Sequence, residues 1–225
     1  GKHLIDVMQS FGVSTKWMLQ DEKYFTTFAF VSLMENGERD FYFNRGADGQ
    51  LSRDEVDAIN LSDFSIVHFG SATGFLPGPL QAAYQSLLQK SLQQDIFISF
   101  DPNYRHLLFQ HDQQSFIDQS WNFLNSCHFF KVSDEEALML TGTQTVKDAA
   151  DVFLEKLNAV FAITLGKEGT LLGRNGKTEI IESISIKPVD TTGAGDAFVG
   201  AVLYQLSDKT LQQVRTLPDD EWKKI

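Results

Sequence analysis

The stretch PVDTTGAGDAFVGA (residues 188–201) is the most informative part of this chain. Two glycines, Gly193 and Gly195, lead into an apolar run that is typical of a helix. The free N–H groups and the dipole at a helix start favour a bound anion. Asp196 stands at the same point, where a carboxylate would repel phosphate. This arrangement makes chemical sense if Asp196 takes a proton from an attacking hydroxyl while the backbone N–H groups hold a transferred phosphoryl group.

Other interpretations of the glycines fit less well. A dinucleotide fingerprint needs a third glycine where this chain has Phe198. A P-loop ending at Gly176-Lys177-Thr178 would need a glycine where Leu171 stands. The plain structural alternative is a tight turn followed by an aspartate that favours a helix start, and for a lone Gly-x-Gly-Asp it is the better explanation. The full string DTTGAGDAF is far more specific.

Strand-like and helix-like segments alternate through the middle of the chain. Expected strands lie at 64–71, 95–103, 128–133 and 159–166, and expected helices near 79–94 and 114–126, with two more helices between 134 and 158. Such alternation indicates βαβ units. We therefore expect an α/β fold with a doubly wound, mostly parallel sheet.

Two hairpins interrupt this alternation. Residues 28–34 and 40–44 read as strands around an Asn36-Gly37 turn, and a second hairpin is expected around Asn175-Gly176. Ser52-Arg53-Asp54-Glu55 is a capping box that opens a short helix.

These patterns predict one large domain with a small projection. Residues 24–50 are expected to form part of a β lid, and residues 51–225 an α/β domain that binds nucleotide and sugar. Residues 1–23 are assigned to the same α/β domain.

Polar or glycine-rich segments follow the expected strands. In parallel sheets, ligands bind beyond the carboxyl ends of the strands. The segments that we expect to converge there are 70–71, 101–105, 131–136, 164–169 and 190–196.

Composition narrows the class of protein. The 225 residues are 42% hydrophobic with a formal net charge of −11, which argues against nucleic-acid or anionic-membrane partners. Cys127 is the single cysteine, so no disulfide framework is expected, and no signal peptide or membrane-spanning run is apparent. The histidines show no ligand spacing, so we assign no zinc. We expect a cytoplasmic protein.

Several motifs together resemble one enzyme family. DTTGAGDAF (190–198) is similar to the second signature of the ribokinase-like sugar kinases, also called the phosphofructokinase-B family. DPNYR (101–105), KVSDEEALMLTG (131–142) and TLGKEG (164–169) resemble further family segments in order and spacing. FYFNRGAD (41–48) looks most like the fructokinase branch.

The resemblance implies a role for each matching residue. Asp196 would be the catalytic base, and Gly193, Ala194 and Gly195 would form the anion hole. The expected nucleotide-binding residues are Lys131, Ser133, Thr164, Gly166 and Gly169. The simpler alternative for Thr164, Gly166 and Gly169 is that they form an ordinary strand-to-hairpin turn. The simpler alternative for Lys131 is that it is a solvated lysine at a strand end.

Metal and sugar contacts are also implied. Glu136 would order magnesium indirectly, although Ser133 replaces the family's Asn and the same residues form a capping box. Asp190 and Thr192 would hold potassium, although Asp190 could equally be a turn cap. The expected substrate-binding residues are Arg45, Asn103 and Arg105, of which Arg45 has an exposed surface charge as its plain alternative.

The implied activity is ATP-dependent phosphorylation of a sugar hydroxyl, with fructose as the expected sugar. The implied cofactors are ATP, Mg²⁺ and K⁺. The alternatives are a sister kinase for ribose, a nucleoside or 2-keto-3-deoxygluconate, and a non-catalytic sugar- or nucleotide-binding relative. A homodimer through the β lid is a further hypothesis, because the hairpin has more apolar side chains than a lone ribbon can bury.

The chain starts with Gly1 and lacks the family's glycine-rich first signature. The resemblance therefore implies that this sequence is the middle of a longer enzyme. On that view, residues 1–225 alone would not be a competent kinase.

Overall fold

The computed structural model of the chain describes residues 1–33, 39–184 and 191–225. The chain divides into two compact units. The first unit contains Gly1–Asn60, Thr73–Leu87 and Arg105–His111. The second unit contains Leu61–Ala72, Leu88–Tyr104 and Asp112–Ile225.

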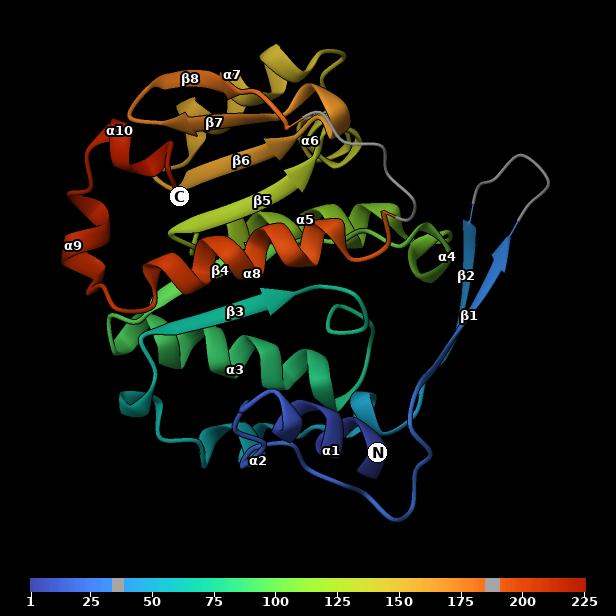
Figure 1. Cartoon of the computed structure of the whole chain (residues 1–225). Coiled ribbons are helices and arrows are strands. Elements are labelled where there is room, and N and C mark those ends of the chain that lie inside the picture. Colours follow the sequence, from blue (N-terminus) through green and yellow to red (C-terminus); the bar gives the residue numbers. More distant parts are fainter. Residues whose placement is uncertain (34–38, 185–190) are drawn as a thin grey trace. The chain divides into compact units, whose positions relative to one another are not determined.

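The first unit holds the expected amino-terminal hairpin. β1 (Phe28–Leu33) pairs antiparallel with β2 (Arg39–Asn44), with Phe28 opposite Asn44 (Figure 1). The side chains of Phe28, Phe30 and Tyr42 are exposed on this ribbon. The Asn36-Gly37 turn that the sequence predicts lies outside the described residues.

Short helices complete the first unit. α1 (Lys2–Ser10), α2 (Arg53–Asp57) and α4 (His106–Phe109) belong to it, and α3 (Pro79–Gln93) contributes residues to both units. α2 begins after Ser52, whose hydroxyl accepts the N–H of Glu55 while the Glu55 carboxylate accepts the N–H of Ser52. The predicted capping box is confirmed.

The second unit is built on a six-stranded sheet with the order β3-β4-β5-β6-β7-β8 (Figure 1). Its parallel strands are β3 (Ile66–Gly70), β4 (Phe97–Asp101), β5 (Phe129–Ser133) and β6 (Val160–Thr164). β7 (Thr170–Arg174) and β8 (Lys177–Ile181) form an antiparallel hairpin that extends the sheet. The predicted α/β fold with a mostly parallel sheet is confirmed, as is the hairpin around Asn175-Gly176.

Helices cover both faces of this sheet because its strands are apolar on both sides. Phe130 packs edge-on against Phe153 of α7 (Val146–Lys156), on the face that also carries α5 (Gln113–Leu124) and α6 (Asp134–Thr141). Its neighbour Phe129 points to the other face and stacks on Trp222 of α10 (Asp219–Trp222).

That second face is covered by α8 (Ala194–Leu206) and α9 (Leu211–Arg215) together with α10. Val202 and Leu206 of α8 join the same buried cluster as Phe97 and Phe129. Each fully buried aromatic or aliphatic side chain contributes about 1.5–3 kcal/mol. This burial holds α8 on the sheet, with its first turn at the edge where the parallel strands end (Figure 1).

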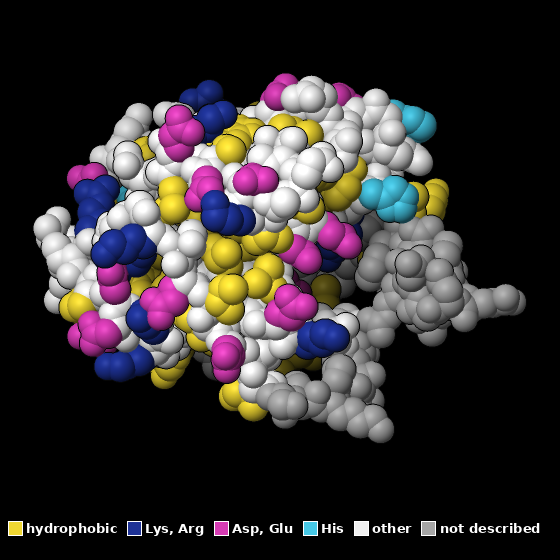
Figure 2. Space-filling view, turned by 90° about the horizontal axis from the view of Figure 1, so that it is seen from above, with side chains coloured by type: hydrophobic (Ala, Val, Ile, Leu, Met, Phe, Trp, Pro, Cys, Tyr) yellow, Lys and Arg dark blue, Asp and Glu magenta, His cyan; other side chains and the backbone are white. Residues whose placement is uncertain are grey.

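The surface carries side chains of both charges. On the face shown in Figure 2, Lys and Arg side chains lie among Asp and Glu side chains, with hydrophobic side chains between them. Among the helices in the described parts of the chain, none is both long enough and apolar enough to cross a membrane.

Candidate active site

The start of α8 leaves backbone N–H groups open. Gly193 precedes the helix with φ of 77°, a left-handed conformation that suits glycine. The Ala194 N–H donates to the Thr191 carbonyl at 3.1 Å, and the Ala197 N–H donates to the Gly193 carbonyl at 2.8 Å. Within residues 1–33, 39–184 and 191–225, no acceptor faces the N–H groups of Gly195 and Asp196. Of the residues expected to form the anion hole, Gly195 thus keeps an N–H without an acceptor in these ranges, and Ala194 uses its N–H within the turn.

A buried lysine lies directly beside this helix start. A Cβ added to Gly195 would lie 3.0 Å from Nζ of Lys131. Lys131 is only 8% exposed, in the middle of β5, on the sheet face that α8 covers. Only a residue without a side chain lets the ammonium group come this close to the first turn of α8. Its charge adds to the positive end of the helix dipole.

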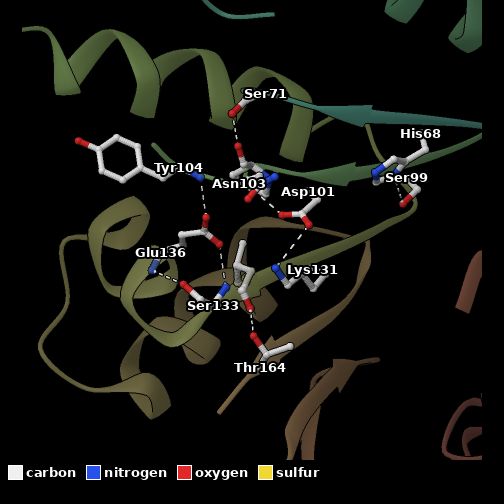
Figure 3. Close-up of polar contacts among 12 residues, drawn as sticks. His68, Ser71, Ser99, Asp101, Asn103, Tyr104, Lys131, Ser133, Glu136 and Thr164 are labelled. Atoms are coloured by element: carbon white, nitrogen blue, oxygen red, sulfur yellow. Dashed lines mark hydrogen bonds and ion pairs between the residues drawn. The ribbon is translucent and has the colours of Figure 1, made fainter. Parts of the chain in front are cut away.

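The partner of Lys131 is Asp101, the last residue of β4. The Lys131 Nζ and Asp101 Oδ2 atoms are 3.4 Å apart, and Asp101 is 4% exposed (Figure 3). β4 and β5 run parallel with Ser99 beside Phe129, so this register brings the two charged side chains to neighbouring positions on one face. Burial raises the pKa of Asp101 to about 6, although the Lys131 charge opposes the shift.

The loop after β4 is fixed by hydrogen bonds. Oδ1 of Asp101 accepts the N–H of Asn103 at 3.1 Å, and the Ser71 hydroxyl donates to the Pro102 carbonyl (Figure 3). Asn103 has φ of 47°, a left-handed conformation that asparagine tolerates. Asn103 therefore sits beside the Asp101–Lys131 pair.

Glu136 ties the loop after β4 to the loop after β5. Its Oε2 accepts the N–H of Ser133 at 2.8 Å, and its own N–H donates to the Ser133 hydroxyl at 3.1 Å. The predicted capping box at the start of α6 is confirmed. Its Oε1 accepts the N–H of Tyr104 at 2.7 Å (Figure 3). The carboxylate is 9% exposed, so its structural role is established by contacts on both oxygens.

The TLGKEG segment forms a tight turn between β6 and β7. The Thr164 hydroxyl donates to the Val132 carbonyl at 3.3 Å (Figure 3), and the Leu165 N–H donates to the Gly169 carbonyl at 2.9 Å. Gly166 and Gly169 have φ of 59° and 108°. A Cβ on Gly169 would overlap the carbonyl oxygen of Ile181, so glycine is required there.

His68 on β3 faces the same region. Its Nδ1 lies 3.1 Å from the Ser99 hydroxyl, in register across β3 and β4 (Figure 3). Desolvation lowers the pKa of His68, while the negative charge of Asp196 raises it. Asp196 itself is exposed on the first turn of α8.

The remaining predicted residues lie in the first unit, just before α8, or outside the described residues. Arg45 lies in the first unit, where it donates to the carbonyls of Pro77 and Thr73, and Arg105 caps α4 in the same unit. Thr192 is exposed just before α8, and Asp190 lies outside the described residues. In the described ranges, no three His, Cys, Asp or Glu side chains gather as a metal site.

The sequence placed Asp101 in the converging segment 101–105 without a role for its carboxylate, and it gave no role to His68. The sequence signal for Asp101 is that a carboxylate directly follows the mostly apolar segment Phe97–Phe100. The signal for His68 was a polar residue inside the expected strand 64–71.

Comparison with known proteins places the chain in a family. The sequence profile described as pfkB family carbohydrate kinase matches residues 1–214. The chain belongs to the pfkB family of carbohydrate kinases.

Individual relatives agree with this assignment. A probable fructokinase-4 of Arabidopsis thaliana is 32% identical over 211 residues, covering 92% of this chain and 64% of the relative. The chain thus spans less than two thirds of the length of that relative.

Solved structures share the fold. A double mutant of the Vibrio cholerae O395 fructokinase, in its fructose-, ADP- and potassium-bound form, matches with a TM-score of 0.84 and 23% identity, over 99% of this chain and 72% of that one. A Pyrococcus horikoshii sugar kinase in complex with ATP matches with a TM-score of 0.77 and 27% identity, over 91% of this chain and 65% of that one.

Proposed function

We propose that this chain carries the phosphoryl-transfer centre of an ATP-dependent sugar kinase, with fructose as the sugar. The observation that supports this most is the first turn of α8. There an exposed carboxylate, Asp196, follows the open N–H of Gly195, and the buried ammonium group of Lys131 lies beside them. A base next to a preorganised anion hole is the arrangement that phosphoryl transfer to a hydroxyl requires.

In the proposed reaction, the Asp196 carboxylate accepts the proton of the sugar hydroxyl. The hydroxyl oxygen forms a bond to the γ-phosphorus of ATP as the bond from that phosphorus to the β–γ bridging oxygen breaks, and ADP leaves. The N–H groups of Gly195 and Asp196 stabilise the negative charge on the transferred group, and the positive charge of Lys131 adds to this stabilisation. Gly193 and Ala194 shape the turn that presents these groups.

The nucleotide is proposed to lie along the ends of β5 and β6. Thr164, Gly166 and Gly169 belong to the turn that would approach the nucleotide closely. Ser133 and Lys131 lie on the neighbouring strand β5.

Metal ions are proposed to assist. Both oxygens of Glu136 already accept N–H groups, which fits a role in ordering the water shell of Mg²⁺ rather than direct ligation. Mg²⁺ supplies charge neutralisation on the phosphates when bound. Asp190 and Thr192 are the proposed potassium-binding residues.

The sugar is proposed to contact Asn103, Arg105 and Arg45, with residues 24–50 acting as a lid that excludes water. We further propose that the protein forms a homodimer through that lid and is located in the cytoplasm. The choice of fructose rests on relatives such as the Arabidopsis protein, whose name is that of a fructokinase.

Replacement of the base tests this function. In the intact protein, Asp196→Asn should lower kcat by about two to four orders of magnitude while ATP affinity stays within a few fold. Asp208→Asn is the matched control, because Asp208 is exposed just beyond the other end of α8. Near-normal turnover of Asp196→Asn would contradict the proposal.

A substrate panel tests the sugar. The panel contains fructose, ribose, a nucleoside and 2-keto-3-deoxygluconate, with kcat/KM as the measure. A preference for a sugar other than fructose would retain the kinase and correct the substrate, and no transfer to any acceptor would favour a binding protein.

A further inference from the structure

The second unit has a cavity at the opposite edge of its sheet, where the parallel strands begin. Its volume is about 600 Å³, and it is lined by the starts of β4 and β6, the segment before β5, and the ends of α5, α7 and α9. Figure 1 shows α9 beside this edge, away from the start of α8. None of the residues proposed for phosphoryl transfer lines it.

The cavity is basic although the protein is acidic. Lys156, Arg174 and Arg215 line it, and no lining residue in the described part of the chain is acidic. The whole chain carries a formal net charge of −11, so this local excess of cations is contrary to the composition. The nearby carboxylates are Asp219, 3.2 Å from Nη1 of Arg174, and Asp95, whose charge acts on His128.

Two hydrogen-bond donors meet in this cavity without an acceptor between them. Nδ1 of His128 accepts the N–H of Ile98 at 3.0 Å, so the neutral imidazole carries its proton on Nε2. Nη2 of Arg215 lies 3.3 Å from that Nε2. Burial and the Arg215 charge lower the pKa of His128 to about 4, which keeps the ring neutral near pH 7. An oxygen atom of an anion could accept from both groups.

Arg174 supplies a third donor. Its side chain is 9% exposed and its Nε has no hydrogen-bond partner among the described residues. The guanidinium carbon lies 5.8 Å from the ring centre of Trp222, which holds the side chain in place. An unpaired donor on a buried charged group costs free energy, and an anion would satisfy it.

We propose that this cavity binds a small organic phosphate. Arg174, Arg215 and the Nε2–H of His128 would hold the phosphate oxygens. The side chains of Phe97, Val160 and Val214 offer an apolar wall for the rest of the molecule. Guanidinium groups match phosphate oxygens in geometry and charge. This site is independent of the proposed kinase activity.

The test measures binding at His128 in the intact protein. The Hε1 resonance of His128 is followed by NMR while inorganic phosphate or fructose 6-phosphate is added to about 20 mM. We expect a saturable shift, and stronger binding of the sugar phosphate than of inorganic phosphate. A bound anion should also raise the pKa of His128, because it stabilises the imidazolium form.

Matched variants decide whether the cavity is responsible. Arg215→Gln, on an exposed side chain, should weaken binding at least about tenfold, and Arg174→Gln should do the same if it folds. Arg53→Gln, an exposed arginine of the first unit, and Asp196→Asn should bind like the wild type. Absence of a saturable shift, or equal binding by Arg215→Gln and wild type, would overturn the proposal.

Discussion

Both edges of the sheet in the second unit carry cationic side chains, but the hydrogen-bond partners of these side chains differ between the edges. At the carboxyl edge, Lys131 is buried and paired with Asp101 at 3.4 Å. At the amino edge, Arg174 keeps an unpaired Nε, and Arg215 faces another donor on His128. Arg174 also has an ion-pair partner, Asp219 at 3.2 Å, so the two edges differ in their hydrogen bonds and not in whether each cation has a partner. A buried lysine held by an internal carboxylate positions a site, whereas guanidinium and imidazole donors without acceptors are suited to recognise an external anion.

The largest expected effect is the loss of the Lys131 charge. Lys131→Met leaves the buried Asp101 carboxylate without its partner and should destabilise the protein by about 3–5 kcal/mol at pH 7 in urea unfolding. Lys156→Met at the amino edge is exposed and should change stability by less than about 0.5 kcal/mol. Adding Asp101→Asn to Lys131→Met should recover much of the loss. Equal effects of the two lysine variants would remove the distinction between the edges.

Replacing a glycine by alanine should lower the stability of the protein by different amounts at the two edges. Gly169→Ala at the carboxyl edge places a Cβ against the Ile181 carbonyl at φ of 108°, so we expect a loss of about 3 kcal/mol. Gly176→Ala at the hairpin tip has φ of 73° but no atom within 4 Å of the new Cβ, so about 1 kcal/mol is expected. Thermal or urea unfolding measures both. The comparison fails if Gly176→Ala is the more damaging change.

The Asp101 carboxyl group should give stability a pH dependence. Its pKa is raised from 3.8 to about 6 in the folded protein, so the folded state binds a proton that the unfolded state releases. Its contribution is therefore greatest below pH 4 and is lost as the pH rises towards 7, by about 2–3 kcal/mol.

The matching measurement uses a variant without this group. The unfolding free energy of wild type minus that of Asp101→Asn should fall by about that amount between pH 4 and pH 7. A constant difference across this range would show that the pKa of Asp101 is not raised in the folded state.

The smallest expected effect on stability is at the helix start. Gly195→Ala brings a Cβ within 3.0 Å of the Lys131 Nζ, so the ammonium group must move. Because the end of a lysine side chain can shift, the stability loss should stay below about 1 kcal/mol, while kcat should fall about tenfold. Gly200→Ala, with nothing within 4 Å of its new Cβ, should raise helix stability by up to about 1 kcal/mol and leave kcat unchanged. Unchanged kcat in Gly195→Ala would count against a role for Lys131 in the anion hole.

Elements with local signals could be predicted from the sequence. The capping boxes at Ser52 and Ser133 and the Asn175-Gly176 hairpin follow from hydrogen bonds and backbone preferences within a few residues. The βαβ alternation predicted the parallel sheet. The DTTGAGDAF string predicted a helix start, and α8 starts at Ala194.

Which charged groups meet depends on long-range packing. Asp101 and Lys131 are 30 residues apart and become neighbours through the register of two parallel strands, which no turn rule fixes. The approach of Lys131 to Gly195 depends on how α8 packs on the sheet, and the meeting of His128 with Arg215 joins residues 87 positions apart. Nearby residues determine the backbone hydrogen bonds of caps and turns. Contacts between distant residues form instead when apolar faces of helices and strands are buried together, and many residues contribute to that burial.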